Sequence, residues 1–458
     1  MFNGALSSKT LWELSEKVVT VNETMGNVNG KFEMPWDQVQ DRMNKATEIR
    51  NLQYTEQIKR LNAEETKGKF ELKNGWGSFI DRYTISIKDE DGKEEKIHAD
   101  YTIIATGSKP RVLPNIDVDE EHIMTSNGIH KLKEYPKSLV ILGAGVIGCE
   151  FATIFSNFGK TKVFLIDRAN RVLPFEDEEI SDMVASNLRE KGVVVHNEAQ
   201  FSRMEIVDGK VEYEISYPKG MSQVIRVDKA LISVGRVPNV EGLGLEKAGV
   251  QLKSGQGSHI LDNDTATNMD NIYAVGDVSG HIALVNVGEI EARHAIEKIF
   301  DKASKPLSYE NICTIMFLHP EVAAVGKNEQ ECQKAGLNYR VVKLDYSKIA
   351  RAIAMESTKG FFKILVTDDD EMKILGMRAV GQHASSAIQA VGLLIKQNRG
   401  IEELAELVHP HPSIIEGIQE CVRILLNKPL FKTQYFAKEI SYYRCKNGKK
   451  EDLKSLVQ

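Results

Sequence analysis

The stretch "SLVILGAGVIGCEFATIFSNFGKTKVFLID", residues 138–167, carries the strongest local signal in the sequence. It predicts an apolar strand, a turn containing Gly143-x-Gly145-x-x-Gly148, a helix, and a second strand that ends on Asp167. Gly143 makes the tight turn, Gly145 lets the backbone approach a pyrophosphate, and Gly148 lets the helix pack against the strand. Phosphate groups would then bind at the positive N-terminal end of the helix. The pattern therefore predicts a dinucleotide-binding βαβ unit.

The acid that ends the second strand indicates which dinucleotide this unit binds. Asp167 lies 24 residues after Gly143. A carboxylate at this position accepts hydrogen bonds from a ribose with two free hydroxyls and repels a 2′-phosphate, which favours NAD over NADP. Arg168 and Arg171 follow directly and weaken that preference, because either could pair with a 2′-phosphate.

Composition sets the limits within which this unit is interpreted. A chain of 458 residues is too long for one core and predicts several domains. Apolar residues make up 42% and the formal net charge is −6, so nothing indicates a polyanion-binding surface. The five cysteines are scattered, without CxxC or Cys/His clusters, which predicts a reducing compartment and no structural zinc. We expect no membrane span, secretory signal or transit peptide.

The two ends of the chain differ from its middle. The first 65 residues predict two helices, one capped by Ser7 or Ser8 and one that starts after Pro35 with Asp37 as its cap. Residues 426–458 hold eight Lys/Arg against three Asp/Glu, interleaved with aromatic residues. One interpretation of such a segment is an arm that binds nucleic acid or an acidic partner. The other is a terminal segment whose aromatic residues pack on the rest of the protein while its lysines face water, and this one is favoured on general grounds.

Six motifs occur together in one order along the chain. They are "IIATGSKPRVLP" (103–114), "GAGVIGCEF" (143–151), "SVGRVPN" (233–239), "YAVGD" (273–277), "LHPEVAAVG" (318–326) and "HPHPSIIEG" (409–417). In order and spacing the chain resembles the flavin-dependent pyridine nucleotide–disulfide oxidoreductases, and within them the dihydrolipoamide dehydrogenase group. The resemblance covers residues 1 to about 425. It implies that the chain uses FAD and NAD and moves hydride between NAD(H) and flavin.

The resemblance also implies roles for individual residues. The cofactor-binding positions that match the family's motifs are Lys9, Gly77, Thr106, Gly107, Ser108, Gly143, Gly145, Gly148, Glu150, Asp167, Gly235, Asp277, Leu284 and Asn286. Among these, Asp277 matches the acid that binds the ribityl chain of FAD, and Gly235 matches a residue close to the nicotinamide. Lys9 matches a flavin-contacting lysine, and Glu150 matches its acidic partner. Asn286 stands where the family usually has His.

A further motif contains the candidate acid–base residue. His411 and Glu416 lie in "HPHPSIIEG", where a carboxylate five residues on could orient the imidazole and raise its basicity. From the residues alone, a helix-capping loop with an incidental histidine is the favoured interpretation. The resemblance instead implies that His411 is the acid–base residue for a substrate dithiol, that Glu416 orients it, and that the pair acts across a homodimer.

The resemblance implies an α/β fold of three parts. These are an FAD-binding Rossmann-like domain (1–118 and 256–305) whose first βαβ unit is missing, an inserted NAD-binding Rossmann-like domain (119–255), and an α+β interface or dimerisation domain (306–425). Residues 426–458 follow as a basic, aromatic extension. The family further implies a homodimer, a 2-oxo acid dehydrogenase complex or another assembly as partner, no membrane and no nucleic acid, and the mitochondrial matrix or the cytoplasm as location.

One departure from the family concerns its redox chemistry. "NGALSSKTLWE", residues 3–13, aligns with the tail of the family's Cys-x-x-x-x-Cys motif. Ala5 stands where the family has the second Cys, and the first Cys would precede Met1. The strand–GxGxxG–helix unit that binds the FAD pyrophosphate in the family would also precede Met1. Either the start of the chain is wrongly assigned or the protein has lost that unit. Two sulfurs are needed for thiol–disulfide exchange with a dithiol substrate.

Three functions therefore remain open at this point. The first is a dihydrolipoamide dehydrogenase-like enzyme in which His411 serves a thiol substrate, and Ala5 counts against it. The second is a disulfide-free flavoprotein, similar to the soluble transhydrogenases or a diaphorase, to which Ala5 is no obstacle. The third is a non-catalytic member of the family that serves as a binding or structural subunit.

Overall fold

The computed structural model describes residues 5–26, 30–61, 69–218, 220–255, 258–303 and 305–454. It divides into two compact units. Unit 1 comprises residues 1–7, 40–132 and 232–307, and unit 2 comprises residues 8–39, 133–231 and 308–458. The mixed α/β architecture predicted from the sequence is confirmed. Among the described helices, none combines the length and the apolar character that crossing a bilayer requires.

The dinucleotide-binding pattern forms a parallel sheet in unit 2. Strands β7 (Ser138–Leu142), β8 (Lys162–Ile166) and β9 (Val194–His196) pair in parallel, and β13 (Lys229–Ile232) lies next to β7. Two helices follow the first two strands, α3 (Val146–Phe158) and α4 (Glu178–Glu190). Strands β7 and β13 are buried along nearly their whole length, as expected for a parallel sheet with both faces covered, whereas β9 at the edge is only partly buried. A three-stranded antiparallel sheet follows, formed by β10 (Gln200–Val207), β11 (Lys210–Ser216) and β12 (Ser222–Val227).

The N-terminal helices are present, but their starts differ from the prediction. Helix α1 spans Ala5–Met25 and buries Leu11, Leu14, Val18 and Val19 on one face, so Ser7 and Ser8 lie inside the helix and do not cap it. Helix α2 spans Trp36–Leu61, which places Asp37 in its first turn. Good helix-forming residues upstream of both serines extend the first helix beyond the expected cap.

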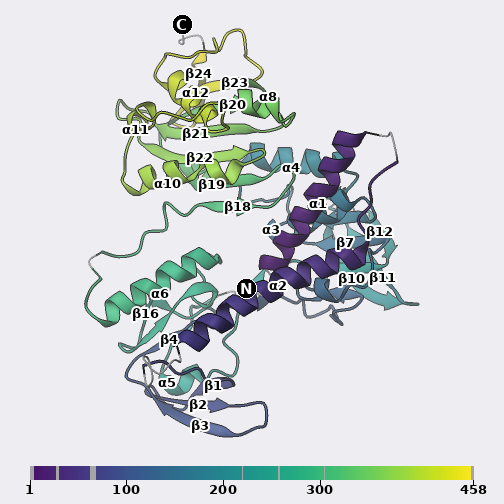
Figure 1. Cartoon of the computed structure of the whole chain (residues 1–458), viewed down its shortest axis with the longest axis vertical. Helices are drawn as coiled ribbons and strands as arrows, with labels where there is room; N and C mark the ends of the chain where they lie inside the picture. Colours follow the sequence, from purple (N-terminus) through teal and green to yellow (C-terminus); the bar gives the residue numbers. More distant parts are fainter. Residues whose placement is uncertain are drawn as a thin grey trace. The chain divides into compact units, whose positions relative to one another are not determined.

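The C-terminal part of unit 2 is built on a seven-stranded sheet (Figure 1). Its strands, in spatial order, are β18 (Thr314–Met316), β19 (Val322–Gly326), β22 (Ile374–Val380), β21 (Phe361–Thr367), β20 (Tyr339–Asp345), β23 (Ile440–Lys446) and β24 (Lys449–Asp452). The helices of this part are α7 (Glu329–Lys334), α8 (Ala350–Ala354), α9 (Ala384–Ala387), α10 (Gln389–Lys396), α11 (Glu402–Ala405) and α12 (Glu416–Leu425). One large apolar core fills the space between sheet and helices.

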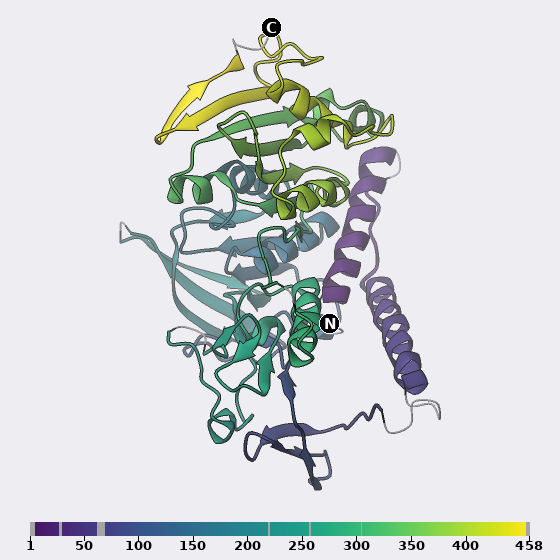
Figure 2. The same cartoon turned by 90° about the vertical axis from the view of Figure 1, so that its left-hand side faces the viewer.

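The C-terminal segment continues this sheet. Strand β23 pairs with β20 over six residue pairs, and β24 forms the outer strand next to it, as the yellow hairpin in Figure 2 shows. Tyr442 and Tyr443 are buried, while Lys449 and Lys450 are exposed. Tyr442 and Tyr443, with the partly buried Phe431 and Phe436, therefore pack on the rest of the domain, as the favoured interpretation of the composition predicts. Tyr435 departs from that interpretation, because it is 76% exposed.

Unit 1 contains short strands, most of helix α2 and helix α6. Strands β1 (Trp76–Phe79), β2 (Thr84–Lys88) and β3 (Glu94–His98) form an antiparallel sheet. A second sheet has the order β15 (Asp262–Asn263), β16 (Ala266–Thr267), β17 (Ile272–Ala274) and β4 (Thr102–Ile104), with β17 and β4 parallel. Strand β5 (Ser108–Pro110) pairs with β14 (Arg236–Pro238), α5 spans Leu245–Ala248, and α6 spans Val285–Ile299. Parallel β4 and β17 end on the same edge, which brings Thr106 and Asp277 to one place.

Candidate functional site

The glycine-rich turn of unit 2 has the geometry that the sequence predicts. Gly143 follows β7 with a φ of 103°, a conformation that side chains rarely adopt, and its N–H donates to Ile166 O at 2.8 Å. Gly145 is the N-cap of α3, and a Cβ added there would meet no atom within 4 Å. Gly148 is buried within α3. The N-terminal end of α3 therefore has open space beside Gly145, and the turn has room for a pyrophosphate.

Asp167 lies at the carboxyl end of β8, beside this turn. Its Oδ2 accepts a hydrogen bond from Ala144 N at 2.6 Å and its Oδ1 accepts one from Ala169 N at 2.8 Å. The carboxylate therefore fixes the glycine-rich turn, and the residue remains partly exposed. Arg171 is engaged elsewhere, because it donates to Pro174 O and Glu176 O.

Lys9 on α1 and Glu150 on α3 form an ion pair within unit 2. Lys9 Nζ lies 2.7 Å from Glu150 Oε2, and Glu150 Oε1 accepts from Phe317 N at 3.1 Å. The ammonium also lies 4.7 Å from the centre of the Phe317 ring. Glu150 is buried, whereas the Lys9 side chain keeps 32% of its exposure. The pairing that the resemblance implied is therefore present, with a fixed and accessible cation.

In unit 1, the loop after β4 is tied to the residues around Asp277. Ser108 Oγ lies 2.5 Å from Asp277 Oδ2, and Arg236 donates from Nε to Ser108 Oγ and from Nη2 to Ser108 O, both at 2.7 Å. Gly107 has a φ of 69°. Thr106 Oγ1 donates to Asn239 O at 2.7 Å, which closes the loop on the segment after β14. Asp277 is partly exposed, so one face of this carboxylate is open to a ligand.

The turn after β17 lies directly against α6. Gly276 has a φ of 73°, and a Cβ added at Gly288 would lie 3.3 Å from Gly276 Cα. The buried Glu291 accepts from Gly276 N at 2.6 Å and fixes this close approach. Leu284 is the N-cap of α6, and Asn286 is exposed in its first turn. The start of a 15-residue helix therefore lies in the same unit as Asp277, with amide groups that suit an anionic or polar ligand.

Two further predicted glycines belong to unit 1. Gly235 has a φ of 107°, its carbonyl accepts from Arg111 N at 2.9 Å, and a Cβ there would lie 3.9 Å from Arg111 Nε. Gly77 lies in β1, opposite Ile87, and a Cβ there would have room at 3.7 Å from Ile85. Backbone conformation therefore explains glycine at 235, whereas the space around position 77 does not require it.

His411 and Glu416 form the pair that the motif allowed. His411 Nδ1 lies 2.7 Å from Glu416 Oε1, and Ser413 N donates to Glu416 Oε2 at 2.8 Å. Burial alone would raise the pKa of Glu416, but the hydrogen bonds from Ser413 N and His411 outweigh it and hold this pKa below its ordinary value. The His411 side chain is 73% exposed, so its other nitrogen is accessible to groups outside this chain.

The thiols of the chain offer no comparable site. All five cysteines are free, and four are buried. Burial raises the pKa of the Cys332 thiol to about 11, and it also raises the pKa values of Cys149, Cys313 and Cys421 above their ordinary range. A thiol becomes a good nucleophile when its pKa is lowered, so none of these four resembles a reactive cysteine. Ala5 is the first described residue of α1.

The structure also reveals an ionic cluster that the sequence analysis did not identify. Lys363 on β21 is fully buried, and its Nζ lies 2.9 Å from Asp177, 2.8 Å from Glu179 and 2.5 Å from Glu329. The three carboxylates lie close enough to hold a metal ion, but the ammonium occupies the position between them. The available signal was a single lysine within the apolar strand "GFFKILVT" (360–367). The cluster joins α4 and α7 to the seven-stranded sheet.

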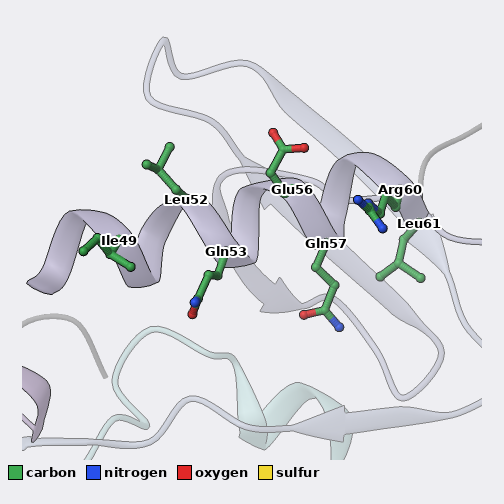
Figure 3. Close-up of a pocket in the computed structure, with 7 residues that line it drawn as sticks. All are labelled: Ile49, Leu52, Gln53, Glu56, Gln57, Arg60 and Leu61. Carbon is green, nitrogen blue, oxygen red and sulfur yellow. The ribbon is translucent and has the colours of Figure 1, made fainter.

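A shallow pocket in unit 1 contains no predicted site residue. It is lined by one face of the second half of α2, with Ile49, Leu52, Gln53, Glu56, Gln57, Arg60 and Leu61. Figure 3 shows that these side chains all project from one helix, with Leu52 and Glu56 on one side and Gln53 and Gln57 on the other. The apolar side chains of Ile49, Leu52 and Leu61 are exposed here. Nothing in the lining indicates a catalytic role.

Comparisons with known proteins agree with this geometry. The model of the pyridine nucleotide-disulphide oxidoreductase family matches residues 4–292, and that of the family's dimerisation domain matches residues 312–422. The chain is 33% identical to a dihydrolipoyl dehydrogenase of Bacillus subtilis over 77% of this chain and 76% of the relative. It is 34% identical to that of Geobacillus stearothermophilus, over 79% and 76%.

Solved structures give the same result. LpdA from Mycobacterium tuberculosis has a TM-score of 0.83 at 25% identity, over 93% of this chain and 90% of that protein. The HOCl-induced flavoprotein disulfide reductase RclA from Escherichia coli, solved as a Cu(II) complex, has a TM-score of 0.80 at 25% identity, over 92% and 90%. The dimerisation domain supports a homodimer. The chain therefore belongs to the pyridine nucleotide-disulphide oxidoreductase family, whose dihydrolipoyl dehydrogenase members use FAD and NAD, and it is an oxidoreductase that resembles dihydrolipoyl dehydrogenase.

Proposed function

We propose that this oxidoreductase oxidises NADH through FAD and delivers the electrons to an acceptor that reacts with the flavin directly, without a redox disulfide. The observation that carries the proposal is the fixed Lys9–Glu150 ion pair in a chain whose five cysteines are all free. FAD, when bound, supplies the hydride acceptor and can pass electrons on singly or in pairs. The residues of the chain bind the cofactors and position charge around them.

The NAD half of the proposal is supported by unit 2. The N–H groups at the start of α3 would hold the pyrophosphate, because Gly145 leaves open space there. Asp167 would accept hydrogen bonds from the adenosine ribose while it keeps the turn fixed through Ala144 N. Arg171 already binds backbone carbonyls, so of the two arginines that could pair with a 2′-phosphate only the exposed Arg168 remains accessible.

The FAD half is supported by unit 1 and by the ion pair. Asp277, held by Ser108, would accept from the ribityl hydroxyls, and Leu284 and Asn286 would present the N-terminal amides of α6. Gly77, Thr106 and Gly107 would lie beside the FAD, whereas Gly235 would lie close to the nicotinamide. Lys9 would place a positive charge near the flavin, where it stabilises negative charge that develops on reduction. We further propose the domains 1–118 with 256–305, 119–255, and 306–425; the separate match of the dimerisation domain to residues 312–422 supports the last of them.

A second candidate function is favoured by the pair His411–Glu416. A carboxylate 2.7 Å from Nδ1 holds the imidazole in one orientation, which suits proton exchange with a dithiol. In that case, His411 of one subunit would serve a substrate at the other subunit of a homodimer, and a 2-oxo acid dehydrogenase complex would be the natural partner. Ala5, in the place of a redox cysteine, argues against this function.

The two functions are separated by the acceptor that the reduced enzyme uses. The full chain is purified with FAD, reduced by NADH under anaerobic conditions, and then mixed with lipoamide, a quinone, a dye or a nicotinamide analogue. We expect reduction of the flavin by NADH and rapid reoxidation by quinone, dye or analogue, with no reaction with lipoamide. Reduction of lipoamide would replace this proposal by the dithiol function, and a chain that binds no flavin would refute both.

A further inference from the structure

A second pocket lies in the C-terminal part of unit 2, next to the loop that carries His411. It has a volume of about 370 Å³ and is lined by Arg351, His383, Ser386, Pro412, Ser413, Ile414 and Ile415. This volume lies within the range of roughly 300–1,000 Å³ that is typical of small-molecule sites. Three elements contribute to it: α8, the start of α9, and the turn before α12.

The polar groups of this pocket lack partners. Arg351 and His383 are exposed, and within the described part of the chain their side chains form no hydrogen bond or ion pair, so both are accessible to a ligand from solution. Ser413 Oγ is buried and likewise has no hydrogen-bond partner. A buried hydroxyl without a partner is unfavourable, so a ligand that forms a hydrogen bond with it gains affinity from that contact. A guanidinium, an imidazole and a hydroxyl around one cavity are the donors that an oxyanion needs.

The carboxylates around the pocket indicate how much negative charge the ligand carries. Glu416 is already engaged by His411 and Ser413 N, and Glu321 accepts from Ser385 N at 2.6 Å, so neither carboxylate is free to neutralise Arg351. Glu416 directly follows Ile415 of the pocket wall, and Glu321 binds Ser385, the neighbour of Ser386 in that wall. The negative charges of these two glutamates disfavour a doubly charged ligand. A single negative charge therefore fits better than a phosphate dianion.

The apolar part of the lining indicates what kind of group is attached to the anion of the ligand. Pro412, Ile414 and Ile415 present carbon to the cavity, which favours an apolar group next to the anion. A planar carboxylate matches the fork of a guanidinium through two parallel hydrogen bonds. We propose that this pocket binds the carboxylate of a small organic acid with a short apolar body, with Arg351, His383 and Ser413 as the donors. The proposal does not depend on the flavin chemistry.

Binding of butyrate to the full-length protein tests this directly. Saturation-transfer NMR gives its dissociation constant for the wild type, for Arg351→Gln and for His383→Asn. Asn tolerates the left-handed backbone of His383, whose φ is 66°, so this variant removes the imidazole without straining the turn. We expect Arg351→Gln to raise the dissociation constant at least fivefold and His383→Asn at least twofold. The matched control is Arg399→Gln, at an arginine in the same part of the chain whose side chain is 61% exposed.

Three results would overturn the proposal. They are no binding of butyrate to the wild type, an equal weakening by Arg399→Gln, and unchanged binding in both His383→Asn and a folded Arg351→Gln. Inorganic phosphate serves as a second probe, because its binding reports an oxyanion site without an apolar wall. We expect phosphate to bind at least fivefold more weakly than butyrate, and tighter binding of phosphate would contradict the assignment of a carboxylate.

Discussion

The ammonium of Lys9 lies 2.7 Å from the carboxylate of Glu150, although 141 positions separate the two residues in the chain. The contact joins α1 to the helix of the glycine-rich turn. Glu150 is buried and its other oxygen accepts from Phe317 N, so the carboxylate cannot turn away from Lys9. The lysine thus keeps one position while part of its side chain remains accessible, which is the condition for a preorganised charge.

This relationship predicts the effect of removing the lysine. Lys9→Met should slow the reduction of bound flavin by NADH by about 10²-fold, because the loss of one preorganised charge has that order of effect. Stopped-flow absorbance under anaerobic conditions measures this rate. Lys17→Met, on the exposed face of the same helix, is the matched control and should leave the rate unchanged. Equal rates in Lys9→Met and the wild type would show that the ion pair is only structural.

The contact between Ser108 and Asp277 leads to a prediction about the affinity of the protein for FAD when Asp277 is replaced. Asp277→Ala removes the acceptor that we assign to FAD and leaves Ser108 without its 2.5 Å partner. We expect the purified variant to bind FAD at least tenfold more weakly than the wild type, since a hydrogen bond to a charged group contributes about 1.5–3 kcal/mol. Flavin fluorescence during titration of the apoprotein measures this. Asp100→Ala, whose carboxylate is 90% exposed, is the control, and equal losses in both variants would argue against a specific role.

The position of Asp167 leads to a prediction about the preference of the protein for NADH over NADPH. Asp167→Ala removes both the proposed ribose acceptor and the bond to Ala144 N, so we expect the dissociation constant for NADH to rise about tenfold or more. Affinity for NADPH should fall less or improve, because the charge that repels a 2′-phosphate is lost. Isothermal titration with each cofactor gives the ratio. An unchanged ratio, or the same change in the exposed Asp182→Ala, would exclude Asp167 as the discriminating residue.

The sequence predicted local features of the fold well, for a physical reason. The turn at Gly143 and the burial of β7 depend on backbone freedom and apolar runs that are visible within 30 residues. The pair His411–Glu416 lies within six residues and was found as a possibility in the same way. The start of α1 was placed too late, since Ser7 and Ser8 are good caps in isolation but lie within a longer helix.

Features that depend on distant contacts could not be read from the sequence. Arg236 binds Ser108 across 128 positions, and Glu291 fixes Gly276 from inside a helix where a glutamate is usually exposed. The strands β23 and β24 complete a sheet whose other members end at residue 380. The sequence around a polar side chain does not indicate which distant residue it will bind. A short stretch of sequence likewise does not show which distant strand it will pair with.

The buried Lys363 predicts a large effect on stability. Lys363→Met removes the cation that the buried Asp177 and the partly buried Glu329 share, while Glu179 keeps its ion pair with Lys343. Breaking a buried ion pair from one side has an effect of about 3–5 kcal/mol. Urea denaturation should therefore show a correspondingly lower free energy of unfolding. Lys359→Met, whose exposed side chain pairs with Glu190, should change it by less than about 1 kcal/mol. Similar midpoints for the two variants would contradict the importance of the cluster.

The same cluster predicts how stability depends on pH. Burial by itself would raise the pKa of Glu179, but Lys363 and Lys343 outweigh it and lower this pKa from 4.5 to about 2. Because the folded pKa lies below the unfolded one, the carboxylate's contribution is complete above about pH 4.5 and is lost as the pH falls toward 2. Glu179→Gln should therefore flatten the decline of the unfolding free energy between these pH values. The neighbouring Glu178→Gln, at a side chain that is 71% exposed, should keep the slope of the wild type, and a wild-type slope in Glu179→Gln would place the acid sensitivity at other carboxylates.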